Sequence, residues 1–92
     1  MACHEGWIEA ADGVRLWHRS WLPEGEPAAG IVFIHGFTEH SGRYSYLAEA
    51  LCRCGHAVDA IDLRGHGASQ GPRVWVRSFD QHVDEVERML VE

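Results

Sequence analysis

The sequence predicts an α/β fold in which a hairpin leads into a strand–helix–strand–helix order. Three observations carry this prediction. The apolar run Gly30–Ile34 has the composition of a strand buried on both faces of a parallel sheet. Apolar residues then recur at helical spacing between Arg43 and Cys54. A second apolar run, Ala57–Ile61, completes a strand–helix–strand unit, which we expect to be a right-handed parallel crossover.

A hairpin is expected before this unit. Trp7–Ala10 fits a short strand, Asp12-Gly13 is a turn signal, and Val14–Leu22 fits a longer strand with partial alternation. The segment Pro23–Pro27 ends that strand in an exposed loop. We interpret this hairpin as the edge of the sheet.

The two expected helices carry recognisable signals at their ends. Ser41 is placed to cap the first helix and Gly55 to end it. Ser78 to Gln81 fits a capping box that opens the last helix, and the chain ends at Glu92 inside that amphipathic pattern. The expected apolar faces are Tyr44, Leu47, Ala48, Leu51 and Cys54 in the first helix, and Phe79, Val83, Val86 and Leu90 in the last.

Length and composition set limits on the function. The 92 residues are at most one small domain, which we place at 1–92, and a net charge of −6 favours neither nucleic acid nor an anionic membrane. No apolar run is long enough to cross a bilayer. The N-terminus lacks the pattern of a signal peptide, so we expect a cytoplasmic protein. Three cysteines, an odd number, fit free thiols.

The stretch GASQG, residues 67–71, matches the G-x-S-x-G pattern of a nucleophile elbow. An elbow serine must lie on a tight turn directly between a buried strand and a helix. Ser69 lies seven residues after the strand end at Asp62 and nine before Ser78, with Pro72 between them. We therefore predict that Ser69 is a loop residue and not a nucleophile.

Two longer motifs follow the two predicted parallel strands. The first is H-G-F-T-E-H-S-G-R-Y, from His35 to Tyr44, and the second is D-L-R-G-H-G-A-S, from Asp62 to Ser69. Together they resemble the signatures of the α/β-hydrolase superfamily. The branch is that of monoacylglycerol lipases and lysophospholipases, also called serine aminopeptidase S33. The resemblance runs from about Trp7 to the end of the chain.

The resemblance implies an oxyanion hole after the first of these strands. In that family, the backbone N–H of the residue that follows His-Gly forms half of the hole, and this residue is Phe37 here. Only a backbone donor is needed, so its side chain is free to vary. The residues expected to support this turn and the neighbouring loop are His35, Gly36, Glu39, His40, Asp62, Arg64, Gly65, His66, Gly67 and Ser69.

The resemblance also implies that the sequence lacks the triad. The family's nucleophile sits on a fifth strand after the helix that begins at Ser78, and its acid, its base, its second oxyanion donor and its lid come later still. We therefore expect an N-terminal part of a hydrolase of carboxylic esters, such as monoacylglycerols or lysophospholipids, which is inactive by itself. Membrane contact is expected only through the lid, and no cofactor or metal is implied. Without the fifth strand, Gly30–Ile34 would be an open, aggregation-prone edge.

Asp59 departs from the family pattern, which has an apolar or aromatic residue at that point of the strand. It either points to a polar pocket or marks a looser strand. Other readings stay open: a metal site at Cys52, Cys54 and His56, which the C-x-C spacing argues against; a degenerate hydrolase kept for binding; or another activity of the fold, such as an epoxide hydrolase or a peptidase.

Overall fold

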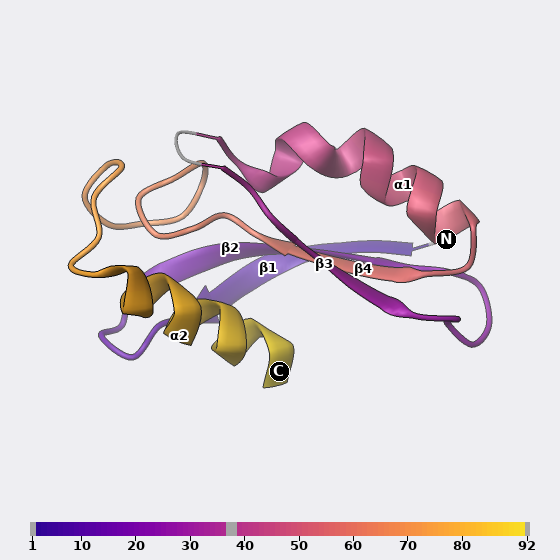
Figure 1. The fold of residues 1–92 in the computed structure, drawn as a ribbon, viewed down its shortest axis with the longest axis horizontal. Coiled ribbons are helices and arrows are strands. Elements are labelled where there is room, and N and C mark those ends of the chain that lie inside the picture. Colours follow the sequence, from indigo (N-terminus) through magenta and orange to yellow (C-terminus); the bar gives the residue numbers. More distant parts are fainter. Residues whose placement is uncertain (1, 37–38, 92) are drawn as a thin grey trace.

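The computed structural model describes residues 2–36 and 39–91. Within them the chain forms β1 (Ala2–Glu9), β2 (Arg15–Leu22), β3 (Gly30–Ile34), a 3-10 turn (Ser41–Tyr44), α1 (Ser45–Arg53), β4 (Ala57–Ile61) and α2 (Phe79–Val91). The strands form one sheet in the order β1-β2-β4-β3 (Figure 1). The expected α/β sheet that opens with a hairpin is confirmed.

The hairpin is longer than its sequence pattern indicates. β1 begins at Ala2, not at Trp7, and pairs antiparallel with β2 over its whole length. The turn forms at Asp12-Gly13, where Gly13 has a φ of +86° that favours glycine. β2 also pairs antiparallel with β4, so the hairpin is joined to the parallel part of the sheet. β1 is the outer strand, as expected for a sheet edge.

β3 and β4 pair in parallel through the crossover helix α1, as predicted. The end of α1 also matches the prediction. Gly55 adopts a φ of +95°, its N–H donates to the carbonyl of Cys52, and the N–H of His56 donates to that of Leu51. The expected cap at the start is wrong: Ser41 begins the 3-10 turn, and its side chain is buried against Arg19.

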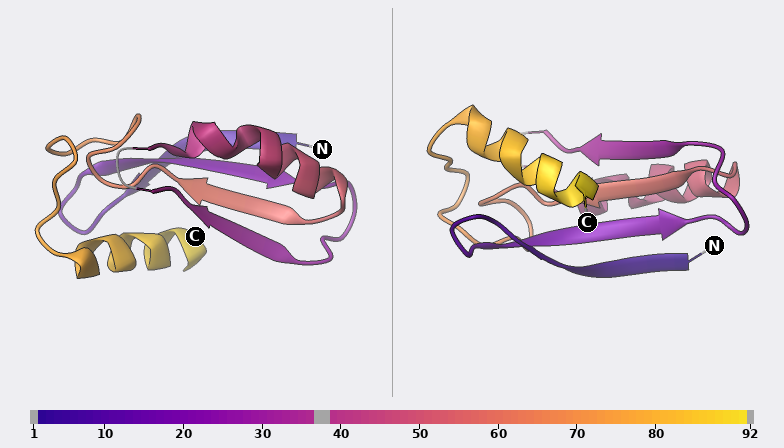
Figure 2. Two further views of the ribbon diagram at one scale, coloured as in Figure 1. Left: turned by 45° about the horizontal axis from the view of Figure 1, so that its top comes forward. Right: turned by 90° about the horizontal axis from the view of Figure 1, so that it is seen from below.

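Two helices cover opposite faces of the sheet and divide the core in two (Figures 1 and 2). On the α1 face the buried residues are Trp21, Ala48, Cys52, Val58 and Ala60. On the α2 face they are Ile8, Ala10, Leu16, Ile61 and Met89. Neighbouring residues of β2 and β4 alternate between the two clusters, as side chains on a pleated strand must.

The apolar faces expected for the two helices are right in part: Ala48, Leu51 and Val86 pack in the core, and other members do not. α1 buries Ala48 and Cys52, whereas Leu47 and Cys54 are exposed. α2 buries Glu85 and Met89, whereas three residues of its expected face, Phe79, Val83 and Leu90, are exposed. The spacing identified both helices, but of the expected stripe of α2 only Val86 packs against the core among the described residues.

β3 is not buried on both faces, which corrects a second expectation. Ile31 and Phe33 pack against the α1 cluster, but Val32 and Ile34 on the opposite face are 37% and 48% exposed. β3 is the outermost strand of the described sheet on this side, so its edge is open there, as the family resemblance led us to expect. The exposed side of β3 and the exposed stripe of α2 meet in an apolar groove that includes Ile34, Phe79 and Val83.

Candidate functional site

The candidate site lies where β3 and β4 end. These strands are parallel, so the loops that follow them, residues 35–44 and 62–78, leave the sheet at the same end (Figure 1). In open α/β sheets, ligands bind outside the carboxyl ends of the strands. Both sequence motifs therefore fall in the part of the fold where function is expected.

His35 is buried and links the two loops. Its Nδ1 lies 2.8 Å from the carbonyl oxygen of Gly36, and its Nε2 accepts the N–H of Leu63 at 2.8 Å. Burial lowers the pKa of His35, although the Gly36 carbonyl acts in the opposite direction. The ring is therefore neutral at neutral pH.

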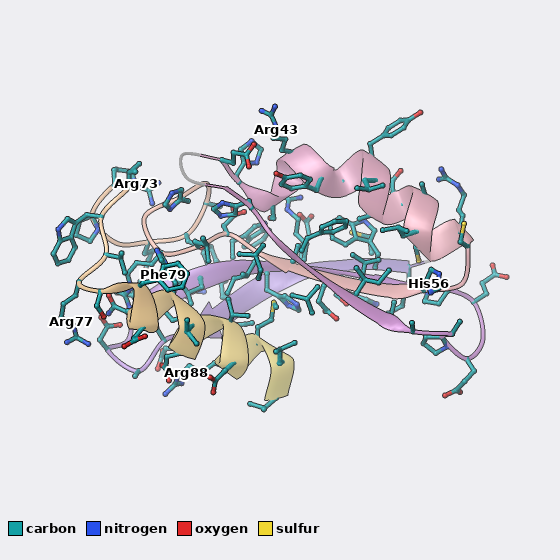
Figure 3. The ribbon with its side chains drawn as sticks, in the orientation of Figure 1. Arg43, His56, Arg73, Arg77, Phe79 and Arg88 are labelled. Carbon is teal, nitrogen blue, oxygen red and sulfur yellow. The ribbon has the colours of Figure 1, made fainter. Side chains whose placement is uncertain are left out.

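Glu39 closes the turn after β3. Its Oε1 accepts the N–H of Gly36 at 2.7 Å and the hydroxyl of Tyr44 at 2.7 Å, while its Oε2 lies 3.1 Å from Arg43 Nε. The Tyr44 hydroxyl and the Gly36 N–H hold the pKa of Glu39 below its ordinary value. A Cβ on Gly36 would lie 2.8 Å from Glu39 Oε1, so a larger residue at this position would displace the carboxylate. Arg43 itself points away from the sheet (Figure 3).

Phe37, the expected oxyanion donor, lies outside the described residues, as does Thr38. The structure describes the residues on both sides of them. Gly36 is held at its N–H by Glu39 and at its carbonyl by His35 and by the N–H of Glu39, which lies 3.1 Å away. The described residues at the two ends of this segment, Gly36 and Glu39, are therefore joined by two hydrogen bonds.

Asp62 joins the second loop to the first. Its Oδ1 accepts the N–H of Ser41 at 2.6 Å and its Oδ2 accepts the N–H of Ala68 at 2.9 Å. Burial raises the pKa of this carboxyl, but the hydrogen bonds from Ser41 and Ala68 outweigh it, and the pKa is lowered overall. Gly67 lies so close that a Cβ there would come within 2.4 Å of Asp62 Oδ2 and 2.8 Å of His40 Cβ. His40 is thus a packing neighbour of this loop.

The Ser69 hydroxyl makes two hydrogen bonds within the fold. Its hydroxyl donates to the backbone carbonyl of Asp62, and its Oγ accepts the N–H of Trp17 in β2 at 2.7 Å. It is buried, in a loop with no helix directly after it. The prediction that GASQG is not an elbow is therefore consistent with the geometry, and the hydroxyl fastens the loop to β2.

Arg64 ties the second loop to α2 and to the hairpin. Its guanidinium lies 2.6 Å from Glu85 Oε2 and 2.7 Å from Asp12 Oδ1. The hydrogen bond with Asp12 is the largest cause of a raised Arg64 pKa, which burial opposes and Glu85 supports. Gly65 has a φ of +74°, and a Cβ there would lie 2.3 Å from the carbonyl oxygen of Pro72.

His66 stands between the two loops and α2. Its Nδ1 lies 2.9 Å from the carbonyl oxygen of Arg64, and its ring lies 5.1 Å from that of His35 and 6.4 Å from that of His82 in α2. Burial lowers the pKa of His82. Every described residue of the expected supporting set therefore lies in this one region.

Sequence reasoning missed several members of this network. Arg19 and Glu85 come from β2 and α2, far from both motifs, and they bond Ser41 and Arg64 respectively. Arg73, within the second loop, donates hydrogen bonds to the carbonyls of Gly67 and Ser69. One feature of the sequence could have indicated this network, namely a Glu inside the amphipathic pattern of α2. An acidic residue on a buried helix face needs a cationic partner.

The structure also shows the surroundings of Asp59 and of the cysteines considered for a metal site. Asp59 Oδ1 lies 3.1 Å from His18 Nε2, and the Asp59 side chain is 38% exposed, in a hollow that is lined by His18 and Ser20 and also by Leu22, Met89 and Leu90. Of the residues that would form the metal site, Cys52 is buried while Cys54 is exposed. Across the described ranges, no three His, Cys, Asp or Glu side chains are grouped to hold a metal ion.

None of the described helices is long and apolar enough to cross a bilayer.

The family model and the related sequences that match this chain agree with each other. Residues 25–92 match the family model Hydrolase_4, described as serine aminopeptidase, S33. The chain is 37% identical over 78 residues to a monoacylglycerol lipase of Mycolicibacterium smegmatis, and 45% identical over 85 residues to the human monoglyceride lipase. Each alignment covers 85% of this chain and 28% of the relative.

The fold agrees with the sequence matches. The structure of a carboxyl esterase from Bacillus coagulans superposes with a TM-score of 0.83, at 23% identity, over 99% of this chain and 32% of that one. The chain thus spans about a third or less of the length of these proteins. The superposition supports the arrangement of the sheet.

Proposed function

This chain belongs to the serine aminopeptidase S33 (Hydrolase_4) family of α/β-hydrolases, and we propose that it forms the N-terminal part of a serine hydrolase that cleaves carboxylic esters. The substrates we propose are monoacylglycerols or lysophospholipids. The observation that carries the proposal is the hydrogen-bonded turn at Gly36, at the carboxyl end of β3, in a chain whose relatives include monoglyceride lipases.

In the proposed reaction a serine from beyond this sequence attacks the ester carbonyl and forms an acyl-enzyme, which water then hydrolyses. The backbone N–H of Phe37 donates one hydrogen bond to the oxyanion of each tetrahedral intermediate. Gly36 has no side chain, so the substrate carbonyl can approach the backbone closely. The residues of this chain supply no general base to the reaction.

The second loop braces the first in this proposal. Asp62 holds the N–H of Ser41, and Leu63 donates to His35, so both attachments run from the end of β4 to the loop after β3. A donor that is already fixed in place does not have to be reoriented when negative charge develops on the oxyanion. This preorganisation is the source of the donor's catalytic effect. Asp62 is therefore a positioning residue in the proposal and not an acid or a base.

Two proteins test the proposal: the complete polypeptide and the 92-residue chain. We expect the complete polypeptide to release fatty acid from a monoacylglycerol or a lysophospholipid and to be labelled by a fluorophosphonate, which reacts with activated serines. We expect the 92-residue chain to do neither. A matched amide substrate separates esterase from peptidase activity.

Ser69→Ala serves as the control in both proteins. It should leave labelling of the folded complete polypeptide unchanged, because the Ser69 hydroxyl is bonded within the loop. Ester turnover by the 92-residue chain that disappears in Ser69→Ala would contradict the proposal. So would a complete polypeptide that hydrolyses neither lipid.

A further inference from the structure

The second loop contains a short segment of mixed apolar and basic character, residues 72–77, which we call the tip loop. Its sequence is P-R-V-W-V-R, with an arginine on each side of an apolar centre and no acidic residue. Val74 is 38% exposed and Trp75 is 58% exposed, whereas Val76 is half-buried. The tip loop therefore presents a large aromatic side chain between two cations, in a chain whose net charge is −6.

The backbone of the tip loop is held in an uncommon conformation. Val74 has a φ of +54°, which a β-branched residue rarely adopts, and no other non-glycine residue in the described ranges has a positive φ. The N–H of Val74 donates to the carbonyl of Gly65 at 2.9 Å, and the N–H of Trp75 donates to that of Pro72 at 3.3 Å. A residue keeps such a conformation only where its surroundings fix it, and these positions are often functional. Val74 and Trp75 are thus presented by a loop that is folded back on itself.

The two arginines of the tip loop have different surroundings. Arg73 donates to the carbonyls of Gly67 and Ser69, so it braces the tip loop against the rest of the second loop. Arg77 is exposed, and its side chain points away from the sheet (Figure 3). Arg77 is therefore placed to meet a negatively charged group outside the molecule.

The tip loop lies at the same end of the sheet as the candidate site. It belongs to the loop after β4, which is joined to the loop after β3 through Asp62 and His35. Figures 1 and 2 show both loops beyond the ends of the two parallel strands. A lipid surface that meets the tip loop is therefore at the end of the sheet where a substrate is expected.

The other exposed apolar surface, the groove that includes Ile34 and Val83, has a different chemistry. It lies on the side of the sheet where β3 has an open edge, and no arginine or lysine lines it. An unpaired strand edge beside an apolar groove suits a further strand of the same polypeptide. The tip loop instead combines Trp75 with Arg77. This is the composition of segments that lie in a membrane–water interface, where Trp sits at the level of the headgroups and cations meet phosphates.

We propose that the tip loop is an interfacial anchor, which inserts Trp75 and Val74 into the headgroup region of a phospholipid surface while Arg77 meets a lipid phosphate. The inference rests on the proposed function, since a hydrolase of monoacylglycerols or lysophospholipids must collect its substrate from such a surface. It departs from the expectation that only the lid meets a membrane. Two apolar side chains give a weak and reversible contact, so the anchor concentrates the enzyme at the surface without embedding it.

Trp75→Ala removes the centre of the anchor, and Trp7→Ala is the matched control. Trp7 is also exposed, at 43%, and also lies beside an arginine, because the Arg15 guanidinium is 4.7 Å from its ring. It belongs to the outer strand β1 and not to the tip loop. Arg77→Gln removes only the exposed charge. Circular dichroism confirms that each variant of the complete polypeptide is folded.

The complete polypeptide is assayed on two esters, a monoacylglycerol held in phosphatidylcholine vesicles and a water-soluble short-chain ester. At low vesicle concentration, we expect Trp75→Ala to slow hydrolysis of the vesicle substrate by about fivefold or more, through a raised apparent KM, and to stay within about twofold on the short-chain ester. Arg77→Gln should slow vesicle hydrolysis by about twofold at low salt and less at high salt. Trp7→Ala should match the unmodified protein on both esters. Equal losses on both esters in Trp75→Ala would indicate a structural role and would overturn the inference.

A second measurement identifies what covers Trp75. Brominated phosphatidylcholine quenches the fluorescence of tryptophans that enter the lipid, and the quenching lost in Trp75→Phe belongs to Trp75. We expect Trp75 to be quenched by this lipid, and we expect vesicles to sediment less of Trp75→Ala than of the unmodified protein.

A Trp75 that the lipid does not quench, and that acrylamide cannot reach without vesicles, would show that the rest of the polypeptide covers the tip loop. That result would overturn the inference alone, because hydrolysis of the short-chain ester would remain. An unmodified polypeptide that hydrolyses neither ester would overturn the proposed function and this inference with it.

Discussion

The buried ion pair between Arg64 and Glu85 holds α2 to the candidate site, and its removal should be costly. Arg64 Nη2 lies 2.6 Å from Glu85 Oε2, and the two side chains are 5% and 3% exposed. The same nitrogen lies 2.7 Å from Asp12 Oδ1, but the Asp12 side chain is 48% exposed. The two acidic partners of one guanidinium therefore differ chiefly in burial.

Glu85→Gln removes one charge and leaves the guanidinium buried with only an exposed partner. Breaking a buried pair from one side costs about 3–5 kcal/mol of unfolding free energy. Each kcal/mol lowers the Tm of a domain of this size by about 4–8 °C, so we expect a fall of about 12 °C or more. Asp12→Asn breaks an exposed pair and should cost about 1 kcal/mol or less.

The assays are thermal unfolding, which gives Tm, and urea unfolding, which gives the free energy. Both are followed by circular dichroism at neutral pH for the two single variants and for the double variant Arg64→Met/Glu85→Leu. The double variant replaces the pair with apolar side chains and should recover much of the stability lost in Glu85→Gln. A Glu85→Gln variant that loses no more stability than Asp12→Asn would refute the reasoning, because the pair would then be as accessible to water as its exposed neighbour.

Three further predictions concern stability. Ser69→Ala should lower the unfolding free energy by about 1–3 kcal/mol, measured in urea, because the Trp17 N–H loses its acceptor; an unchanged midpoint would contradict the described bond. Gly65→Ala should cost more than Gly25→Ala, since both have φ near +75° but only the Cβ at Gly65 meets backbone, and equal losses of Tm would contradict this. Stability should fall as pH drops below about 6.5. Burial lowers the pKa of His35 and His82, so the unfolded chain then binds protons that the native chain does not. A urea midpoint that stays flat or rises between pH 7 and 5 would contradict this prediction.

The sequence predicted the order of the elements well because local signals were strong. The strand β3 was predicted with its observed bounds, and so was β4. The Schellman end at Gly55 follows from a residue type that favours positive φ. The start of α2 after Ser78 was also predicted, although the Gln81 side chain accepts the N–H of Arg77. The length of β1 could not be predicted, since its first residues are polar and are held by pairing with β2.

The orientation of the helices was harder to predict for a physical reason. An apolar stripe indicates a face that can be buried, but it does not say which neighbour is available to bury it. In α2 the pair with Arg64 places Glu85 against the sheet, and the stripe that includes Phe79 and Val83 is left exposed beside Ile34. The same limit explains why β3 was expected to be buried on both faces.

The loops of the candidate site were predicted as motifs but not as a network. The motifs named His35, Glu39 and Asp62, yet their bonding depends on distances between two loops that only the folded sheet sets. The bond from Leu63 to His35 is an example, because any residue type could supply that backbone N–H. Residue identity in the sequence therefore located the site, and the fold determined how its parts are joined.

The coding sequence beyond the codon of Glu92 tests the central claim most directly. If this chain is the N-terminal part of a serine hydrolase, the reading frame continues through an apolar strand into a G-x-S-x-G turn and a helix. Phe37 then becomes an oxyanion position that can be tested together with that serine. A stop codon directly after Glu92, in a protein that is made and folds at this length, would contradict the claim.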